Sequence, residues 1–309
     1  VINVPTQVFA FSGGMLHYHE HKVGISIELL DVYKTVKNRN TGKPLNIVDG
    51  TSMGVEPNSF VVVVGGSGTG KSSLLGCITG ASPCTSGSVC FDGIDTRGNR
   101  NAFDAVLGYV PQKDIMHDEL TVEQSLTYTA KLRIARDATR TEIKAAVAHA
   151  IEAVDLGGRE KTMIANLSGG QKRRVAIAGV MAMEPKVLIL DEPTAGLDPR
   201  GRDEILAQIR AYHETKQATV ILVSHSMEEI ARNVGRIVVM RDAHVYMDGT
   251  PRQVFARAEE LEQAGLDVPQ VTKIAMALRR RGMDIDPAVY TIEELEQALL
   301  ARRGGGEKC

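Results

Sequence analysis

The stretch Phe60–Thr79, FVVVVGGSGTGKSSLLGCIT, decides the fold of this chain of 309 residues. Apolar residues lead into a loop with the pattern G-x4-G-K-[ST], Gly65–Ser72, and an apolar-periodic helix follows the loop. Glycines let backbone N–H groups close around phosphate oxygens, and the N-terminus of the helix adds partial positive charge. The stretch therefore predicts a phosphate site formed by Gly65, Gly66, Ser67, Gly68, Thr69, Gly70, Lys71, Ser72 and Ser73.

Two side chains of this loop suit a nucleoside triphosphate. Lys71 is expected to reach the β- and γ-phosphates, and the hydroxyl of Ser72 is expected to ligate Mg²⁺. The plainer interpretation, a glycine-rich turn, explains neither side chain. The sequence therefore predicts a site for a nucleotide with Mg²⁺, with Lys71 among the catalytic residues.

Outward from the loop, short apolar runs alternate with helical stretches. Runs that are apolar throughout are typical of strands buried on both faces, and such runs are Phe60–Val64, Val187–Leu190 and Thr219–Val223, with Arg236–Met240 as a fourth candidate. Between residues 118 and 183 the sequence is mostly helical, most clearly at Thr121–Arg136, Thr141–Val154 and Gln171–Met183. This alternation predicts an α/β fold with a parallel sheet covered by helices.

Polar residues follow several of these strands, where α/β sheets bind their ligands. Asp191 suits the Mg²⁺ shell, whereas Glu192 points elsewhere and is a candidate base for the attacking water. His225 is a candidate donor to the γ-phosphate. Gln112 follows another strand-like run and is a candidate sensor of Mg²⁺ or of the attacking water. An acidic surface loop or a packing histidine would be the plain interpretation of each residue alone, but beside a phosphate loop they indicate one site.

A second anion site is predicted at Leu167–Gln171, LSGGQ, before a helix that begins with the basic run Lys172–Arg174. Its residues Ser168, Gly169, Gly170 and Gln171 expose N–H groups at the start of that helix. One nucleotide does not need two such sites in one chain. We therefore expect a head-to-tail pair of subunits, in which each phosphate loop faces the partner's LSGGQ segment and the nucleotide holds the pair together.

Together these segments resemble the nucleotide-binding subunit of an ABC (ATP-binding cassette) transporter over about residues 25–255. In order, they are similar to the Walker A, Q-loop, signature, Walker B, D-loop and H-loop motifs: Gly65–Ser72, Gln112, Leu167–Gln171, Val187–Glu192, Ala195–Asp198 and His225. The resemblance implies a P-loop NTPase with a RecA-like core, an antiparallel β subdomain, and a helical subdomain at about residues 113–183. It also implies ATP and Mg²⁺ as cofactors, Glu192 as catalytic base, Asp198 at the nucleotide, and a dimer that closes over two ATP molecules.

The resemblance is divided along the chain. Residues 27–135, notably YVPQKDIMHDELTVE from residue 109 to residue 123, are similar to G-type exporters and related ABC ATPases. Residues 164–303 resemble the ATPase subunits of energy-coupling factor (ECF) importers of vitamins and metals, in which the C-terminal extension belongs to the ATPase pair. Many ABC proteins stack adenine on an aromatic residue, but our alignment places Val36 there, with Tyr33 nearby. We therefore expect an aliphatic adenine platform.

These observations predict an ATP-hydrolysing motor subunit. It would pair with a second ABC ATPase subunit, identical or different, and power transport through a separate transmembrane coupling subunit. ECF-type vitamin or metal uptake is favoured, because a G-type exporter fuses its transmembrane span after the cassette and none follows here. The alternatives are a G-type-like exporter ATPase, a soluble ABC ATPase acting on nucleic acid or ribosomes, and a cassette that binds ATP without turnover.

Composition argues against a nucleic-acid partner. The 36 basic and 38 acidic side chains leave a net charge of -2, and only 4% of residues are aromatic, with no Trp. No apolar run approaches the ~20 residues that cross a bilayer, no signal-peptide pattern opens the chain, and the four cysteines form no CxxC pair. We expect a reduced, peripheral protein at the cytoplasmic face of the cell membrane, in contact with the membrane only through its partner.

The chain divides into four expected parts. Residues 1–24 form an extension, interpreted as loosely ordered, although His17, His19 and His21 could bind a metal if the segment were a strand. Residues 25–255 form the ATPase domain, residues 256–303 form a C-terminal helical extension, and residues 304–309 form a tail. In the C-terminal region, helix signals are Thr250-Pro251, Gly265, Pro269–Arg281 before Gly282, and a capping box at Thr291 that opens a helix to about Arg303.

Overall fold

The computed structural model describes residues 2–4, 7–12, 15–20, 24–38, 41–99, 103, 106–112, 116–133, 138–227, 230–231 and 234–303. The backbone alone is described up to residue 20. The predicted tail at residues 304–309 lies outside the described residues.

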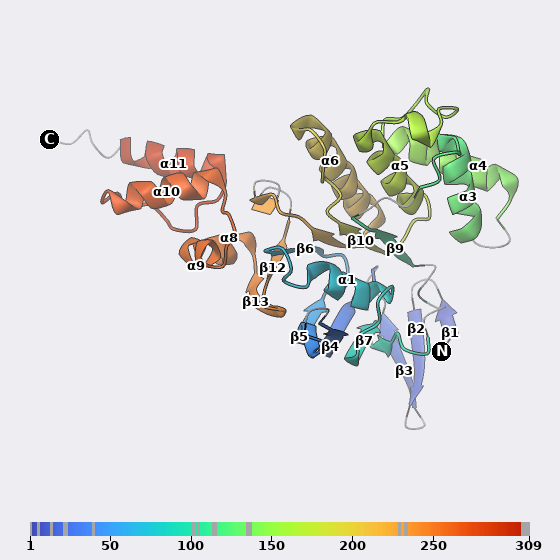
Figure 1. Cartoon of the computed structure of the whole chain (residues 1–309), viewed down its shortest axis with the longest axis horizontal. Coiled ribbons are helices and arrows are strands. Elements are labelled where there is room, and N and C mark those ends of the chain that lie inside the picture. Colours follow the sequence, from blue (N-terminus) through green and yellow to red (C-terminus); the bar gives the residue numbers. More distant parts are fainter. Residues whose placement is uncertain are drawn as a thin grey trace.

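The centre of the molecule is a six-stranded sheet in the order β13-β12-β6-β11-β10-β9 (Figure 1). Five of its strands run parallel: β6 (Phe60–Gly65), β9 (Leu107–Val110), β10 (Val187–Asp191), β11 (Thr219–Val223) and β12 (Arg236–Arg241). The four strands predicted from apolar runs are confirmed. The sequence interpretation missed β13 (His244–Gly249), which pairs antiparallel with β12 at the edge of the sheet.

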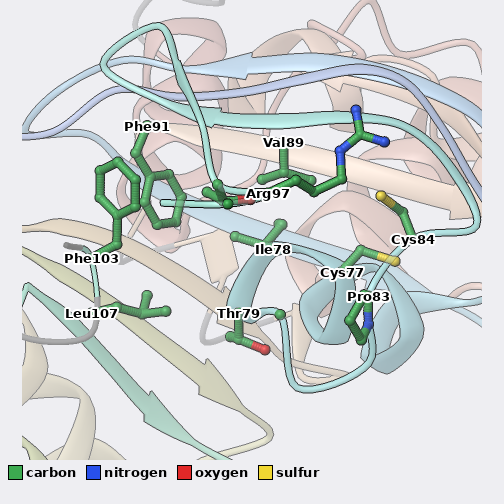
Figure 2. Close-up of a pocket in the computed structure, with 13 residues that line it drawn as sticks. Cys77, Ile78, Thr79, Pro83, Cys84, Val89, Phe91, Arg97, Phe103 and Leu107 are labelled. Carbon is green, nitrogen blue, oxygen red and sulfur yellow. The ribbon is translucent and has the colours of Figure 1, made fainter. Parts of the chain in front are cut away.

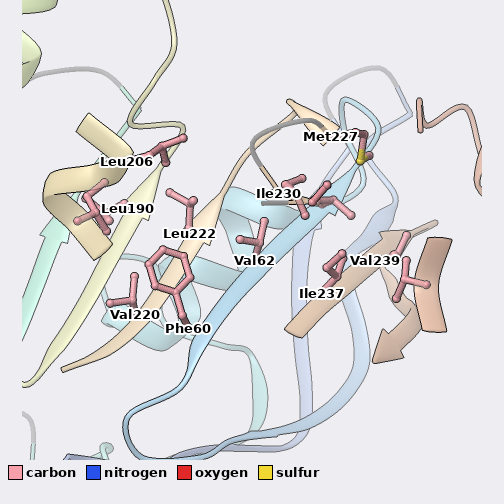
Figure 3. Packing of buried hydrophobic residues seen from close by; sticks show 14 of the residues in the cluster. Phe60, Val62, Leu190, Leu206, Val220, Leu222, Met227, Ile230, Ile237 and Val239 are labelled. Atoms are coloured by element: carbon pink, nitrogen blue, oxygen red, sulfur yellow. The ribbon is translucent and has the colours of Figure 1, made fainter. Parts of the chain in front are cut away.

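The sheet separates two hydrophobic cores, because successive side chains of a strand point to opposite faces. On β6, Val62 and Val64 belong to the core under α6 (Pro199–Lys216), whereas Val61 and Val63 belong to the core under α1 (Lys71–Thr79). Figure 3 shows the first of these cores, with side chains from neighbouring strands meeting Leu206 of α6. Burial on both faces explains why these strands are apolar throughout.

An antiparallel β subdomain packs on the α1 side. Its strand order is β5-β4-β7-β8, formed by β4 (Ile27–Lys37), β5 (Pro44–Val55), β7 (Ser86–Phe91) and β8 (Ile94–Asp95). Side chains of β4, β5 and β7 share one core with α1. The antiparallel β subdomain that the family resemblance implies is therefore present.

The helical subdomain, defined here as α3–α5, has its own core. It comprises α3 (Val122–Arg133), α4 (Arg140–Ala153), the 3-10 helix η1 (Ile164–Asn166) and α5 (Gly169–Met181). The predicted helices are therefore confirmed to within a few residues. Apolar side chains from all three α-helices, among them Leu126, Ile151 and Val175, form a separate buried cluster. This subdomain can therefore behave as a packed body of its own beside the sheet.

Four short helices complete the chain: α8 (Pro251–Phe255), α9 (Ala258–Gln263), α10 (Gln270–Arg280) and α11 (Ile292–Arg303). Helices α8 and α9 extend the main core, whereas α10 and α11 form a small cluster of their own. The side chain of Thr250 caps α8, and Gly265 and Gly282 adopt left-handed conformations near the ends of α9 and α10, as predicted.

The first twenty residues differ from the prediction of a loosely ordered extension. Their backbone forms a three-stranded antiparallel sheet of β1 (Ile2–Val4), β2 (Gln7–Ser12) and β3 (Met15–Glu20). Alternating apolar and aromatic residues around a glycine pair are a hairpin signal that the sequence interpretation undervalued. His17 and His19 lie on β3, and His21 is outside the described residues. Among the side chains that the structure describes, no cluster of three metal-binding groups occurs.

Candidate functional site

The phosphate loop, Gly65–Ser72, connects the end of β6 to the start of α1. Gly70 precedes the helix with a φ of 96°, a left-handed conformation that favours glycine. A Cβ atom at Gly70 would lie 2.1 Å from the backbone oxygen of Ile47 in β5. The loop therefore needs glycine here for two reasons, backbone conformation and contact with the β subdomain.

The Lys71 side chain is enclosed by the loop. It is 6% exposed, and its Nζ donates hydrogen bonds to the backbone oxygens of Gly65 and Gly66, each at 2.8 Å. Burial lowers the pKa of Lys71, while the nearby carboxylates of Glu192 and Asp191 oppose that shift. The structure thus brings a positive charge, the loop and both predicted carboxylates together.

Asp191 is the last residue of β10 and is only 2% exposed. Burial raises the pKa of this carboxyl group, and the hydroxyl of Ser72 acts in the opposite direction as the second cause. Its Oδ1 atom is buried and has no hydrogen-bond partner among the described residues. A buried, unpartnered carboxylate oxygen beside a serine hydroxyl is the donor chemistry that fits Mg²⁺.

Glu192 joins the two remaining predicted residues. Its Oε2 accepts a hydrogen bond from Nε2 of Gln112 at 2.9 Å, and its Oε1 lies 2.7 Å from Nε2 of His225. The backbone of Glu192 has a φ of 51°, an uncommon conformation for a residue other than glycine that often marks functional sites. Beside it is a cavity of about 140 Å³, lined by Glu192, Thr194, Ala195, Arg202, Ser224, His225 and Ser226. The cavity leaves room for water next to the carboxylate.

The LSGGQ segment begins α5, away from this cluster. Ser168 is the N-cap, and its hydroxyl accepts from the backbone N–H of Gln171 at 3.3 Å, while the amide oxygen of Gln171 accepts from the backbone N–H of Ser168 at 3.0 Å. Ser168 and Gly169 are exposed. The first turn of α5 therefore presents its positive end to the outside of the chain.

The structure also places the remaining predicted nucleotide contacts, Val36 and Asp198, and the neighbouring Tyr33. Val36 is on β4, paired with Leu45 of β5, and is half-buried. Tyr33 lies further back on β4, where its hydroxyl approaches Gly50. Asp198 is the N-cap of α6, and its Oδ1 accepts from the backbone N–H of Gly201 at 3.2 Å.

Arg173 is the residue that the sequence interpretation missed. It is 3% exposed, and its guanidinium donates to the backbone oxygens of Pro111, Asp191 and Pro193. The run Lys172–Arg174 is typical of the basic start of a helix. Its sequence does not indicate which of the three basic side chains is buried. Only the packing of α5 against the end of β10 decides that.

A second hollow lies at the C-terminal end of α1 (Figure 2). It has a volume of about 280 Å³ and a mainly apolar lining that includes Ile78, Val89 and Phe91. The thiols of Cys77 and Cys84 border it, and both cysteines are free. No residue of the predicted nucleotide set lines this hollow, so it is separate from the phosphate site.

The described part of the chain contains no helix with the length and apolarity needed to span a membrane.

Comparisons with known proteins agree with the geometry. A family model described as ABC transporter matches residues 48–195. The energy-coupling factor transporter ATP-binding protein EcfA2 of Clostridium perfringens is 42% identical over 254 residues, which are 80% of this chain and 87% of that protein. The match therefore extends beyond residues 164–303, where the sequence interpretation had placed the ECF resemblance.

Two solved structures share the fold. The cbiO1 protein of Clostridium perfringens, part of the ABC transporter complex cbiONQ, has a TM-score of 0.67 and 29% identity, over 83% of this chain and 96% of that chain. The dimeric bacterial ABC transporter cassette MJ0796 also has a TM-score of 0.67, with 25% identity, over 72% of this chain and 98% of that chain. Family match, fold and site together establish that the chain belongs to the ABC transporter family, as an ATPase subunit of the energy-coupling factor type.

Proposed function

We propose that the chain works as half of a pair of ATPase subunits that closes over two ATP molecules. Each chain supplies the phosphate loop and Glu192 of one site and the LSGGQ segment of the other. The observation that carries this proposal is the hydrogen-bonded cluster of Gln112, Glu192 and His225 at the carboxyl end of the sheet, next to Lys71. The exposed first turn of α5 supports the sharing of sites, because it presents N–H groups outward rather than into the same chain's loop.

We assign the following roles to the site residues on the basis of their positions. Lys71 and the N–H groups of the loop bind the β- and γ-phosphates. Glu192 holds and deprotonates the attacking water in the adjoining cavity, and His225 donates to the γ-phosphate. Ser72 and Asp191, with Gln112, would hold Mg²⁺, which neutralises phosphate charge when it is bound. The backbone groups of Ser168–Gln171 stabilise the γ-phosphate of the site in the partner.

Several further contacts of the nucleotide are part of this proposal. Val36 of the β subdomain would pack against the adenine ring, as an aliphatic surface. Asp198, at the start of α6, would lie at the interface between the two subunits. The remaining loop residues, among them Ser73 in the first turn of α1, would complete the phosphate site.

We further propose that the pair drives ECF-type uptake of a vitamin or a metal ion through a separate transmembrane coupling subunit, from the cytoplasmic face of the membrane. The ATPase domain would be residues 25–255, with the helical subdomain at about 113–183 reaching the coupling subunit. Residues 256–303 would contribute to the pairing of the ATPases. Purification after mild solubilisation of the membrane tests this, because a transmembrane ECF coupling protein should accompany the chain. An exporter subunit in its place would contradict the import proposal.

Substitution Glu192→Gln tests the proposed catalysis. Loss of a general base should slow hydrolysis by about 10²–10⁴-fold while ATP still binds. Since hydrolysis releases the pair, the variant should accumulate as an ATP-bound dimer, measured by small-angle scattering or gel filtration. A matched control is Glu204→Gln, because this half-buried carboxylate of α6 pairs with Arg200 and Arg174 rather than with the catalytic cluster; the variant should hydrolyse at the wild-type rate. A Glu192→Gln variant that stays monomeric at saturating ATP would contradict the two-site proposal.

A further inference from the structure

Arg173 connects three pieces of backbone that surround the catalytic cluster. It lies in the first turns of α5, two positions after Gln171. Its guanidinium donates to the oxygen of Pro111 at 2.6 Å, to that of Asp191 at 2.8 Å, and to that of Pro193 at 3.2 Å. Pro111 immediately precedes Gln112, and the other two acceptors flank Glu192. One side chain therefore holds the backbone next to Gln112 and on both sides of Glu192.

The chemistry of arginine suits this arrangement. A guanidinium carries five N–H donors in a rigid plane, so it can satisfy acceptors in several directions at once, and it stays charged when buried. Lysine has a single nitrogen and cannot reach three separated carbonyl groups with the same geometry. Arg173 is 3% exposed, and buried hydrogen bonds to a charged group are costly to lose. The contacts are therefore a strong constraint on the loop around Glu192.

The neighbours of Arg173 behave differently. Lys172 pairs with Asp118 at 2.7 Å on the surface, and Arg174 pairs with Glu204 of α6. Neither of these described ion pairs involves the catalytic cluster. Within the basic run, Arg173 is thus the member whose described bonds go to the ends of β9 and β10.

Arg173 also belongs to α5, the helix whose first turn is formed by the LSGGQ segment. The first turn of α5 is rigid, because Ser168 and Gln171 cap it reciprocally. A displacement of this helix start would therefore move Arg173, and with it the carbonyls around Glu192. The contacts form a continuous physical connection between the surface that meets the partner and the same chain's own catalytic base.

We propose that Arg173 is a positioning residue that couples docking of its α5 on the partner's nucleotide to the placement of Glu192 and Gln112 in its own site. The proposal rests on the proposed function, since it requires two shared sites. It predicts that Glu192 of each subunit becomes aligned only after α5 of the same subunit has docked on the nucleotide of the partner. Arg173 itself touches neither nucleotide.

Arg173→Lys, with Arg173→Gln as a second variant, tests the positioning role. Because a misplaced base leaves phosphate contacts intact, kcat should fall about 10–100-fold while ATP affinity stays within about threefold of the wild type. Arg174→Lys is the matched control, since it makes the same exchange one position along the helix, and it should keep the wild-type kcat. Circular dichroism and ATP binding establish that the variants are folded. A wild-type kcat in both Arg173 variants would overturn the proposal.

Mixed dimers of two differently tagged copies reveal which site Arg173 serves. In a first dimer, one copy carries both Arg173→Lys and Glu192→Gln, and the other copy is wild type. In a second dimer, Arg173→Lys is in one copy and Glu192→Gln is in the other. Glu192→Gln disables one site but leaves ATP and both α5 helices in place, so if Arg173 serves its own chain's Glu192, the first dimer has both defects in the same site and keeps one intact site, whereas the second dimer loses both.

Single-turnover measurement of ADP formed per dimer distinguishes the two cases, with a dimer of wild type and Glu192→Gln as the one-site reference. We expect the first dimer to match the reference and the second to fall well below it. The reverse pattern would mean that Arg173 acts only on the partner's site, and would overturn the proposal. A wild-type chain that neither dimerises with ATP nor hydrolyses it would contradict the proposed function itself, whereas a working wild type with unaffected Arg173 variants contradicts this inference alone.

Discussion

Two adjacent carboxylates, Asp191 and Glu192, have different environments although they are neighbours in sequence. Asp191 is the last residue of β10, and its buried side chain lies beside Ser72. Glu192 has left the strand, and its left-handed backbone turns its carboxylate toward Gln112 and His225. The division between the proposed metal ligand and the proposed base therefore follows from one backbone conformation at the end of a strand.

Substitution Asp191→Asn should stabilise the nucleotide-free chain while it abolishes Mg²⁺-dependent hydrolysis. The pKa of Asp191 is raised, chiefly by burial, so the charged carboxylate destabilises the fold at neutral pH. This penalty is absent below the ordinary carboxyl pKa and is complete above the raised pKa. The stability advantage of the variant, measured by thermal unfolding, should therefore be largest at neutral pH and shrink on acidification.

Hydrolysis by the Asp191→Asn variant should drop by at least about 10²-fold, because the metal loses a charged ligand. Glu184→Asn is a useful control, since this carboxylate pairs with Lys216 on the surface and should not alter the rate. An Asp191→Asn variant that is less stable than the wild type at neutral pH, and equally stable at low pH, would contradict the assigned direction of the pKa shift.

At the scale of elements, the phosphate loop depends on the β subdomain as well as on its own strand and helix. The backbone oxygen of Ile47 in β5 occupies the space that a side chain at Gly70 would need. Gly68 also has a positive φ, of 80°, but no atom lies within 4 Å of a Cβ built there. A side chain at Gly68 would therefore add backbone strain alone, whereas a side chain at Gly70 would add strain and a clash with β5.

Gly70→Ala should lower the free energy of unfolding by about 2–5 kcal/mol, combining left-handed strain with overpacking against a backbone atom. Gly68→Ala should lower it by only about 1–2 kcal/mol, from strain alone. Chemical denaturation of the nucleotide-free variants measures both values. Equal losses would show that contact with β5 does not restrain the loop.

At the scale of the whole molecule, the two halves of the proposed nucleotide site lie on separately packed bodies. The phosphate loop stands on the central sheet, whereas the LSGGQ segment belongs to the helical subdomain, which has its own core. Figure 1 shows α5 and α1 on opposite sides of the sheet. In the proposed pair, the loop of one chain would meet the LSGGQ segment of the other, which a single chain keeps apart.

Complementation between two inactive variants tests this arrangement. Lys71→Ala removes the loop's charge, and Ser168→Arg blocks the capped start of α5, so each variant alone should be inactive. Mixing them should recover ATPase activity to about the level of the Arg173 variants, 10–100-fold below wild type. One site of each mixed dimer combines an intact loop with an intact LSGGQ segment, but it belongs to the copy whose own α5 cannot dock. Mixing Lys71→Ala with Lys71→Arg is the matched control and should recover none. Failure of the first mixture, with dimers formed, would refute shared sites.

Much of this protein follows from local sequence. Strands such as Val187–Asp191 are apolar throughout because both of their faces are buried. The loop Gly65–Ser72 needs glycines because of its backbone conformation. Both features can therefore be recognised from the local sequence. The strands β7 and β8 lack such a pattern and were not predicted. The sheet β1–β3 was not predicted either, because its hairpin signal was undervalued.

Only the tertiary structure decided which polar side chains meet. Gln112, Glu192 and His225 are far apart in sequence, and their hydrogen bonds exist because parallel strands β9, β10 and β11 end at the same edge of the sheet. Arg173 is buried and donates hydrogen bonds to three backbone carbonyls, whereas its neighbours Lys172 and Arg174 form ion pairs with Asp118 and Glu204. Contacts of this kind depend on how α5 packs against the sheet. They cannot be predicted from the periodicity of α5 alone, because that periodicity does not specify which groups of the sheet α5 will meet.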